Sequence, residues 1–431
     1  MVQNEDFIYR FKGNKPPKNL FFNVDFPETK KEYNGRELVY LDTAASALKP
    51  QTVIDAESRF SLNSYANISR GISSLSTNAT NSYEEARENV LKFITSKPDD
   101  AALIVTSGAT QSLNLAANYY SDKLKKGDEI IISIAEHHSN MLPWKALADK
   151  TGAALKIADV NDEGEITVET VMDKISKNTK VVVLTHISNV IGAITPLEKI
   201  SKLVHSVGAD FVVDAAQSVG HIKVDFSEIG CEMAAFSAHK VYGPTGLGFL
   251  FCKKSLIDNF PPFIVGGGTV DNVTVNPNAK RPSRIMDVEF KKGIAHLEAG
   301  TPPISQMVAF REVISLFNST DRHLMINTEK VLTRKLLELG EIDGIKILGP
   351  KSAENKIGIV SFYHESIHPH DLGQFLDDQS IVCRVGHNCA APIHQRFGIS
   401  SSVRFSTGVY NTPEQIDQAI EAVKEAVKFL S

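Results

Sequence analysis

Short apolar segments recur along the middle of this chain, and the stretches between them are long enough to form helices. They cover residues 101–105, 129–133, 180–184, 210–214, 232–236 and 247–251. Runs of this length are typical of buried strands, and the segment 197–207 between two of them has a helical pattern. Strands that alternate with helices predict an α/β fold, a mostly parallel sheet with helices on both faces. Ligands in such folds bind at the carboxyl ends of the strands.

The chain has 431 residues, enough to form more than one hydrophobic core. We expect an N-terminal arm over residues 1–36, because this stretch is rich in Lys, Asn and Pro. A large domain over 37–310 would hold the sheet and the ligand site. A smaller α+β domain over 311–431 is predicted from strand patterns at 356–362 and 402–405 and from a closing helix at 413–429.

Charge and cysteine content exclude several classes of protein. With 46 basic and 51 acidic residues the net charge is −5, which gives no indication of nucleic-acid binding. No apolar run reaches the length of a membrane span and residues 1–6 lack a signal-peptide pattern, so we expect a cytoplasmic protein without a membrane partner. The cysteines are too few and too irregular for a disulfide framework, and no Cys-x-x-Cys pair suggests zinc. We therefore expect free thiols and no metal.

Lys240 is the first candidate for chemistry, because it lies between the strand 232–236 and a turn rich in Gly and Pro at 243–246. A lysine at a strand end can be partly desolvated, which lowers its pKa and makes it a nucleophilic amine. Asp214 ends another buried strand, and a buried carboxylate needs a cationic partner. The protonated ring nitrogen of pyridoxal phosphate is such a partner. The alternative is an ordinary solvated lysine in a turn.

The turn at 106–110 connects a strand to a helix predicted over 111–120. The free N–H groups of a first helical turn, the helix dipole and the Thr110 hydroxyl all favour an anion at one place, which predicts a phosphate site. Ordinary N-capping by Thr106 or Ser107, with no ligand, is the alternative.

A last group of candidates lies near the C-terminus. Arg384 and Arg404 suit a carboxylate, because the planar guanidinium donates two parallel hydrogen bonds, and an amino-acid substrate carries such a group. Cys389 follows Gly386 and His387 on a predicted exposed loop, where a thiolate could react. The alternative is an inert, buried cysteine.

Three motifs together resemble those of a known enzyme family. They are Asp214-Ala-Ala-Gln217, Ser237-Ala-His239-Lys240 and the segment Arg384-Val-Gly-His-Asn-Cys389-Ala-Ala-Pro392. They are similar to the signature of the class V aminotransferase superfamily, in particular of the Suf-type (group II) cysteine desulfurases. The resemblance covers residues 36–431 and implies fold type I, pyridoxal 5'-phosphate as the cofactor and L-cysteine as the substrate.

The resemblance also implies a role for each residue of a cofactor pocket. Lys240 would carry the cofactor covalently, Asp214 would pair with the ring nitrogen and Gln217 would bond the ring hydroxyl. His137 would stack on the ring and shuttle a proton, and Asn189 would contact the ring oxygen or the substrate. The residues implied to hold the phosphate are Ala109, Thr110, Ser237 and His239, together with Thr301 from a second subunit, which implies a homodimer.

The implied reaction is the removal of sulfur from cysteine. Arg384, Arg404 and Asn189 would hold the substrate, and the Cys389 thiolate would attack its sulfur, which leaves a persulfide on Cys389 and releases alanine. The sulfur would then pass to an acceptor protein for iron–sulfur cluster assembly or another transfer.

The chain departs from the family pattern where Thr269-Val270-Asp271 replaces the end of a Gly-Gly-Gly-Glu-Met segment, and where Ser69, Ser73 and Asn388 stand at positions at which the desulfurases usually carry histidine. Two alternatives stay open. One is a C–S lyase, selenocysteine lyase or epimerase of the same fold, which would need Lys240 but no thiol nucleophile. The other is a pyridoxal-phosphate-binding interaction protein with little turnover.

Overall fold

The centre of the molecule is a seven-stranded sheet in the order β4-β10-β9-β8-β7-β5-β6. The computed structural model describes residues 24–69, 71–278 and 285–431. Within the sheet all strands run in one direction except β10, which lies antiparallel between β4 and β9. The strands are β4 (Ala101–Thr106), β5 (Glu129–Ser133), β6 (Ala154–Ala158), β7 (Thr179–Thr185), β8 (Asp210–Asp214), β9 (Met233–Ser237) and β10 (Gly248–Lys253). The predicted strands are confirmed, and β6 is a strand that the sequence pattern did not reveal.

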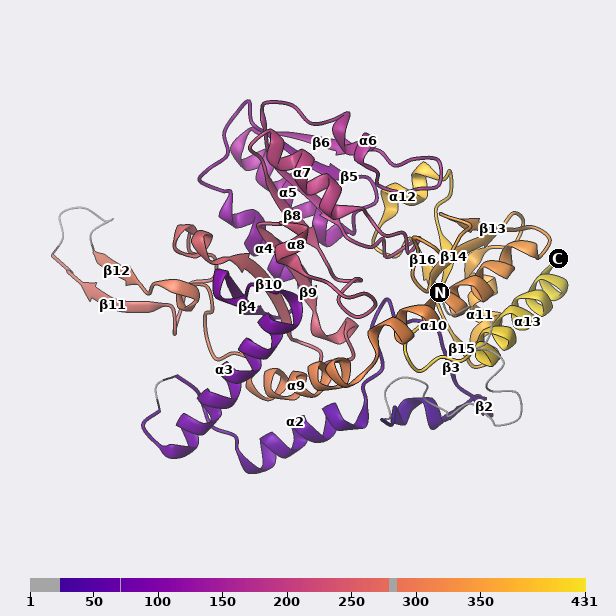
Figure 1. The fold of residues 1–431 in the computed structure, drawn as a ribbon, viewed down its shortest axis with the longest axis horizontal. Coiled ribbons are helices and arrows are strands. Elements are labelled where there is room, and N and C mark those ends of the chain that lie inside the picture. Colours follow the sequence, from indigo (N-terminus) through magenta and orange to yellow (C-terminus); the bar gives the residue numbers. More distant parts are fainter. Residues whose placement is uncertain (1–23, 70, 279–284) are drawn as a thin grey trace.

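Helices cover both faces of this sheet (Figure 1). Neighbouring residues of one strand point to opposite faces, so Ile130 and Ile132 pack in one core with Trp144, whereas Ile131 packs in the other. The first core includes α4 (Ala109–Tyr119) and α5 (His138–Thr151), and the second includes α2 (Gln51–Asn63), α3 (Ser74–Ile94), α7 (Leu197–Ser206) and α9 (Ile304–Ser319). The predicted α/β fold class, with helices on both faces of a mostly parallel sheet, is confirmed.

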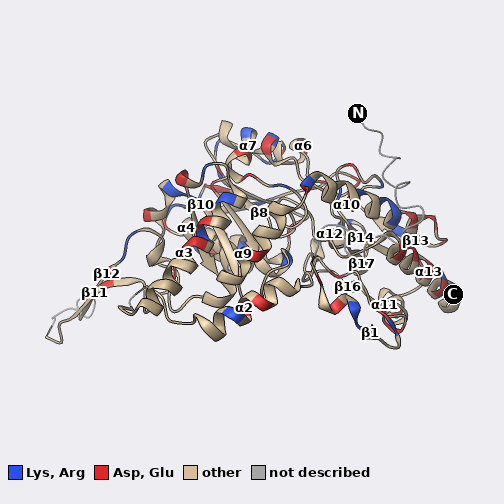
Figure 2. Cartoon of the chain, turned by 60° about the horizontal axis from the view of Figure 1, so that its bottom comes forward, with Lys and Arg blue, Asp and Glu red and all other residues tan. Residues whose placement is uncertain are grey.

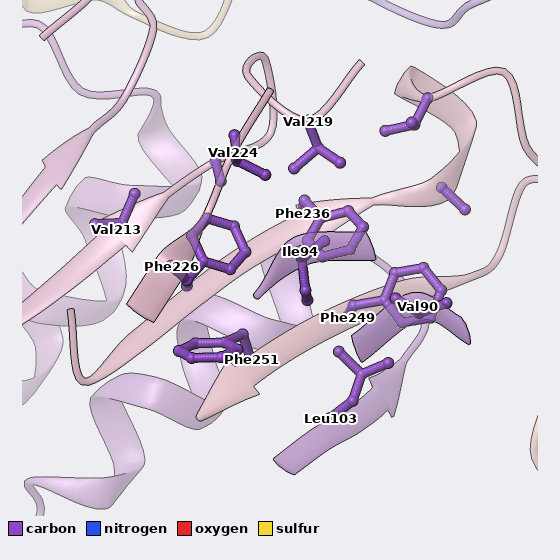
Figure 3. Packing of buried hydrophobic residues seen from close by; sticks show 14 of the residues in the cluster. Val90, Ile94, Leu103, Val213, Val219, Val224, Phe226, Phe236, Phe249 and Phe251 are labelled. Carbon is purple, nitrogen blue, oxygen red and sulfur yellow. The ribbon is translucent and has the colours of Figure 1, made fainter. Parts of the chain in front are cut away.

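Aromatic side chains fill the core beside β9 and β10. The rings of Phe236 and Phe249 lie 4.9 Å apart between centroids, and Phe249 lies 5.2 Å from Phe310 of α9. Figure 3 shows this layer together with Val90 and Ile94 of α3. Complete burial of one such phenylalanine contributes about 1.5–3 kcal/mol. The strand ends that carry Asp214 and Lys240 are therefore supported by a tightly packed layer.

The C-terminal part forms a second, antiparallel sheet in the order β13-β14-β17-β16. Its own apolar core includes Phe362, Phe405 and Val423. The elements are β13 (Ile345–Leu348), β14 (Ile359–His364), β16 (Arg384–Gly386) and β17 (Ser402–Ser406), with α10 (Arg322–Leu337), α11 (Pro369–Asp378) and α13 (Pro413–Leu430). These elements give a smaller α+β unit at the side of the large sheet (Figure 1).

Residues 38–41 differ from the expectation that they enter the large domain. The strand β3 (Val39–Tyr40) pairs in parallel with β15 (Ile381–Val382), beside the C-terminal sheet. The reason is apolar burial, because Val39 and Leu41 are buried in the C-terminal core. This pairing places Asp42 beside the C-terminal strands that carry the two candidate arginines.

The predicted domain limits stay predictions. Helix α9 runs across the proposed limit at residue 310 and packs on α2 and α3 of the large unit. Of the proposed arm, residues 1–23 lie outside the described residues, and 24–36 contain η1 (Pro27–Lys30), β1 (Glu32–Tyr33) and β2 (Arg36–Glu37).

A hairpin of β11 (Val270–Val275) and β12 (Met286–Phe290) projects from the large unit, as Figure 1 shows. Residues 279–284 lie outside the described part of the chain. The remaining elements are α6 (Val168–Met172), α8 (Phe226–Ile229), α12 (Ala391–Arg396), η2 (Pro98–Asp100), η3 (Ala238–Lys240), η4 (Lys254–Asn259), η6 (Gly293–His296) and η7 (Glu338–Glu341).

Basic and acidic residues are interspersed over the outer helices (Figure 2). Among the described helices, none combines the length and the apolar composition that crossing a bilayer would require.

Candidate active site

A cavity of about 230 Å³ opens at the carboxyl ends of the parallel strands. It is enclosed by the turns that follow β4, β5, β7, β8 and β9, as expected for this fold class. Every residue predicted to bind the cofactor lines this cavity except Thr301. These residues are Ala109, Thr110, His137, Asn189, Asp214, Gln217, Ser237, His239 and Lys240.

Lys240 ends a single 3-10 turn directly after β9. Among the described residues, no side chain or carbonyl forms a hydrogen bond or ion pair with its Nζ. Burial lowers the pKa of Lys240, and the carboxylate of Asp214 only partly offsets this effect. The result is an unpaired Nζ in the cavity with a lowered pKa, which favours the neutral amine that reacts with a carbonyl group.

Asp214 is the last residue of β8 and is 4% exposed. One of its oxygens accepts the N–H of Ala216 at 2.9 Å, and no cation forms an ion pair with it among the described residues. Burial raises the pKa of Asp214. A buried carboxylate without a cationic partner is unfavourable by itself, so this side chain is suited to a positively charged ring nitrogen in the cavity.

The N-terminus of α4 forms one wall of the cavity. Gly108 is its N-cap and supplies no side-chain cap. Ser237 Oγ accepts the N–H of Ala109 at 2.7 Å, so the hydroxyl proton of Ser237 stays available for an anion. Gly248 allows this close approach, because a Cβ at that position would lie 2.2 Å from Gly108 Cα. Thr110 shares a hydrogen bond of 2.8 Å with Ser139 at the mouth of the cavity.

His137 is the N-cap of α5, and its Nδ1 accepts the N–H of Ser139 at 3.0 Å. Burial lowers the pKa of His137 to about 3, and the positive charge of Lys240 adds to this effect. The imidazole is therefore neutral near pH 7, and its proton lies on Nε2 because Nδ1 is an acceptor. The ring lines the cavity and can both stack on a planar ligand and donate a proton from Nε2.

Glu136 fixes the position of His137, a role that the sequence reading missed. Its carboxyl group is fully buried and accepts the N–H of Thr185 at 3.1 Å and the Nδ2–H of Asn140 at 2.6 Å. Burial raises the pKa of Glu136 to about 8. These bonds connect the end of β5 to the end of β7. The sequence signal for this role is the acidic residue directly before His137 and His138.

Gln217 and His239 line the cavity but also bond neighbouring backbone and side chains. Gln217 Nε2 donates to the carbonyl of Ala44 at 2.8 Å, and His239 Nδ1 lies 3.2 Å from Ser46 Oγ. The segment 42–46 therefore closes the cavity on the side of the small unit. Burial lowers the pKa of His239 to about 4, so its ring is neutral near pH 7.

Asp42 lies between the two candidate arginines. Its Oδ2 accepts from Arg384 Nη2 at 2.7 Å, and its Oδ1 accepts from Arg404 Nη2 at 3.1 Å. Arg404 is 3% exposed and also donates from Nη1 to the carbonyl of Asn189 at 2.9 Å. Its Nε is buried and has no partner among the described residues. Arg404 therefore keeps one free N–H donor, at Nε, for a carboxylate ligand, while its Nη2 is bonded to Asp42.

Cys389 is exposed on a loop that reaches back to the cavity. The carbonyl of the preceding residue, Asn388, accepts Nδ2–H of Asn189 at 2.7 Å, and Asn189 lines the cavity. Cys389 also lies within electrostatic range of Lys240 and Arg404. The other cysteines differ, because Cys231 and Cys252 are buried and burial raises the pKa of Cys383 to about 12.

Thr301 lies in a separate cavity of about 490 Å³, which Ser69 also lines. Its loop is held by Glu298, whose carboxylate forms two hydrogen bonds to Arg87 at 2.7 and 2.9 Å. Because Thr301 and Lys240 line different cavities, a single chain does not bring Thr301 to Lys240.

Ser73, at a position where histidine is usual, has a structural role here, because its side chain caps α3 by accepting the N–H of Ser76.

Three observations show that the cavity lined by Lys240 and Asp214 fits pyridoxal phosphate. Lys240 supplies an unpaired amine for the aldehyde, and Asp214 supplies a buried carboxylate without a cationic partner. The N-terminus of α4 with Ser237 supplies hydrogen-bond donors for a phosphate.

Comparisons with known proteins give matches over most of the chain. The family model described as Aminotransferase class-V matches residues 39–419. The chain is 37% identical over 414 residues to the probable cysteine desulfurase 2 of Mycobacterium leprae, which covers 94% of this chain and 96% of that relative. It is 36% identical over 412 residues to the cysteine desulfurase of Salmonella agona, with 94% and 98% covered.

A solved structure shows the same fold. The apo cysteine desulfurase of Thermococcus onnurineus superposes with a TM-score of 0.84 at 35% identity, over 91% of this chain and 95% of that one. The predicted resemblance to the class V superfamily is thereby confirmed.

Proposed function

This chain belongs to the class-V aminotransferase family, and from that membership we propose that it is a cysteine desulfurase that takes sulfur from L-cysteine and leaves L-alanine. The observation that carries this proposal is the position of Cys389. Its thiol is exposed, its loop is bonded to Asn189 of the cofactor cavity, and it lies within electrostatic range of Lys240. A lyase of the same fold would need Lys240 but no thiol at this place.

Pyridoxal phosphate is the cofactor, and when bound it supplies an electron sink for negative charge that develops at the substrate Cα. Lys240 would hold it covalently, and Asp214 would hold the ring nitrogen. The phosphate would bind at the N-terminus of α4 and Ser237, with Thr110 and His239 beside it.

Lys240 also moves a proton. Burial lowers its pKa, so a larger fraction of the amine is neutral near pH 7 than for a solvated lysine. The amine is therefore suited to exchange a proton with the substrate Cα. His137 also lines the cavity, where it would restrain the planar ligand and offer Nε2–H as a donor.

Arg404 would bind the substrate carboxylate through its Nε–H, which has no partner among the described residues, while its Nη2 stays on Asp42. Arg384 has 49% of its side chain exposed, whereas Arg404 has 4%. Arg384 can therefore leave Asp42 and reach toward the substrate at a lower energetic cost than Arg404. Asp42 holds both guanidinium groups in place when no substrate is bound.

Cys389 accepts the sulfur. Its thiolate attacks the substrate sulfur, so that an S–S bond forms while the bond between that sulfur and the substrate Cβ breaks. The electron pair of the broken bond stays with the three-carbon fragment, which takes up a proton and leaves as alanine. The product on the protein is a persulfide at Cys389, from which the sulfur passes to an acceptor protein.

A homodimer is part of this proposal. Thr301 and Ser69 line a cavity away from Lys240, which is the arrangement expected if they complete the site of a second copy. Apolar side chains near the end of α2 and before α3 are also exposed, Leu62 to 82% and Ile72 to 103%, which is typical of an interaction surface. Membership of the Suf-type subgroup, a role in iron–sulfur cluster assembly and a cytoplasmic location likewise stay predictions.

Incubation of the purified protein with cysteine and pyridoxal phosphate tests the function. Alanine and a persulfide that maps to Cys389 are expected, and Cys389→Ala should lose both products while it still binds the cofactor. Cys383→Ala is the matched control, because this thiol is near in sequence but held in its protonated form. Alanine released at the parent rate by Cys389→Ala would refute the mechanism, and pyruvate as the main product would indicate a lyase.

A further inference from the structure

Two helices from distant parts of the chain cap each other beside Cys389. His138 is the first residue of α5, and its N–H donates to the carbonyl of Cys389 at 2.7 Å. Ala391 is the first residue of α12, and its N–H donates to Nε2 of His138 at 3.3 Å. N–H groups in a first helical turn lack a partner in their own helix, so each bond satisfies one such donor. The pair of bonds encloses the segment from Cys389 to Ala391.

The backbone that these bonds hold is strained. Asn388 and Cys389 have φ angles of 52° and 53°, in the left-handed region. This conformation costs about 1 kcal/mol or more for each non-glycine residue and persists where neighbouring contacts hold it. The contacts come from His138 on one side and from Asn189 Nδ2, which donates to the Asn388 carbonyl at 2.7 Å, on the other.

The protonation of the ring agrees with its role as an acceptor. Burial lowers the pKa of His138, and the nearby His387, whose ring centroid lies 5.6 Å away, adds to this effect. The ring is therefore neutral near pH 7, with Nε2 free to accept the Ala391 N–H and the proton on Nδ1. His138 does not line the cofactor cavity, whereas the adjacent His137 does.

We propose that His138 is a positioning residue for the sulfur transfer, in which its Nε2 holds the Cys389 loop through the Ala391 N–H without contact to substrate or cofactor. The two consecutive histidines thus have different roles, since His137 lines the cofactor cavity and His138 bonds the loop that carries the thiol. This inference rests on the proposed desulfurase function, because the position of Cys389 matters only if its sulfur reacts.

Two substitutions separate the hydrogen bond from the bulk of the ring. His138→Gln places an amide oxygen near the former Nε2, whereas His138→Asn stops at the position of Nδ1 and cannot reach Ala391. In holoenzyme, we expect His138→Asn to slow persulfide formation on Cys389 about five- to tenfold and to speed amide hydrogen exchange at Ala391 by a similar factor, the size expected for one lost hydrogen bond. His138→Gln should restore both to within about threefold of the parent.

A control histidine shows whether the effect is specific. His368 caps α11 through its Nδ1, so His368→Asn removes a capping imidazole outside the site and should leave persulfide formation unchanged. Cofactor absorbance should stay at the parent level in all variants.

Parent-level persulfide formation in His138→Asn would overturn the inference, whether or not the exchange at Ala391 had become faster. Equal losses in the Asn and Gln variants would also overturn it, because the acceptor would then have no role. A parent protein that forms no persulfide at all would overturn the proposed function and this inference together.

Discussion

The hydroxyl oxygen of Ser237 accepts the N–H of Ala109 at 2.7 Å, which joins the end of the strand before Lys240 to the N-terminus of α4. The two residues are 128 positions apart in the chain. This bond sets the distance between the lysine and the phosphate end of the cavity. It also leaves the Ser237 proton as a donor for an anion.

Substitution Ser237→Ala should therefore weaken pyridoxal phosphate binding about tenfold or more, because a hydrogen bond to a charged group contributes about 1.5–3 kcal/mol. Titration of the apoprotein by absorbance measures this change. Ser112→Ala is the control, since Ser112 is buried on the same helix and bonds Thr106 at 2.8 Å away from the cavity. Equal affinities in parent and Ser237→Ala would contradict the proposed phosphate site.

Lys240→Ala should abolish the covalent attachment of the cofactor, so that borohydride reduction labels no lysine. A second buried lysine makes a stringent control. Lys356 is 2% exposed, its Nζ has no partner among the described residues, and burial lowers its pKa to about 7. It does not line the cofactor cavity, so Lys356→Met should keep the label on Lys240. A label that maps to Lys356 in the parent would show that the assignment is wrong.

Arg404→Lys should raise the KM for cysteine about tenfold to a hundredfold, because an ammonium keeps the charge but cannot bond Asp42 and Asn189 while it presents the fixed Nε–H of a guanidinium to the substrate. Arg384→Lys should have a smaller effect on the KM, since the side chain of Arg384 is about half exposed and water competes for its hydrogen bonds. Steady-state kinetics on both variants give the comparison. A larger KM effect for Arg384→Lys would reverse the assignment of the main carboxylate anchor.

The apoprotein should lose stability as the pH falls below about 6.5, partly through His137. Its pKa is lowered from 6.5 to about 3 in the folded state. The unfolded chain then binds more protons than the folded chain between these values, so the free energy of unfolding decreases from about pH 6.5 towards about pH 3. His137→Asn keeps an N-cap residue and should show a smaller drop in melting temperature between about pH 7 and about pH 5. An unchanged drop would mean that His137 is not buried in the neutral form.

Much of the large unit was predictable from local patterns. Short apolar runs within segments of about five residues predict buried strands, and β4, β5, β7, β8, β9 and β10 lie where they were expected. Asp214 ends β8 and Lys240 ends the turn directly after β9, the neighbouring parallel strand, and the carboxyl ends of parallel strands meet at one edge. The cofactor side of the cavity follows from this rule. The pairing of β3 did not follow, because a two-residue strand carries too little pattern to indicate its partner.

The sequence by itself determined the sheet, the helix that faces a phosphate and the residues at the strand ends, because each depends on the spacing of side chains along one element. Only the tertiary structure placed Asp42 between Arg384 and Arg404, 342 residues from the first and 362 from the second, and brought the loop of Cys389 against His138. Such contacts depend on how two separate cores pack against each other. Side-chain periodicity describes which face of an element is buried, and it contains no information about which distant loop covers that face.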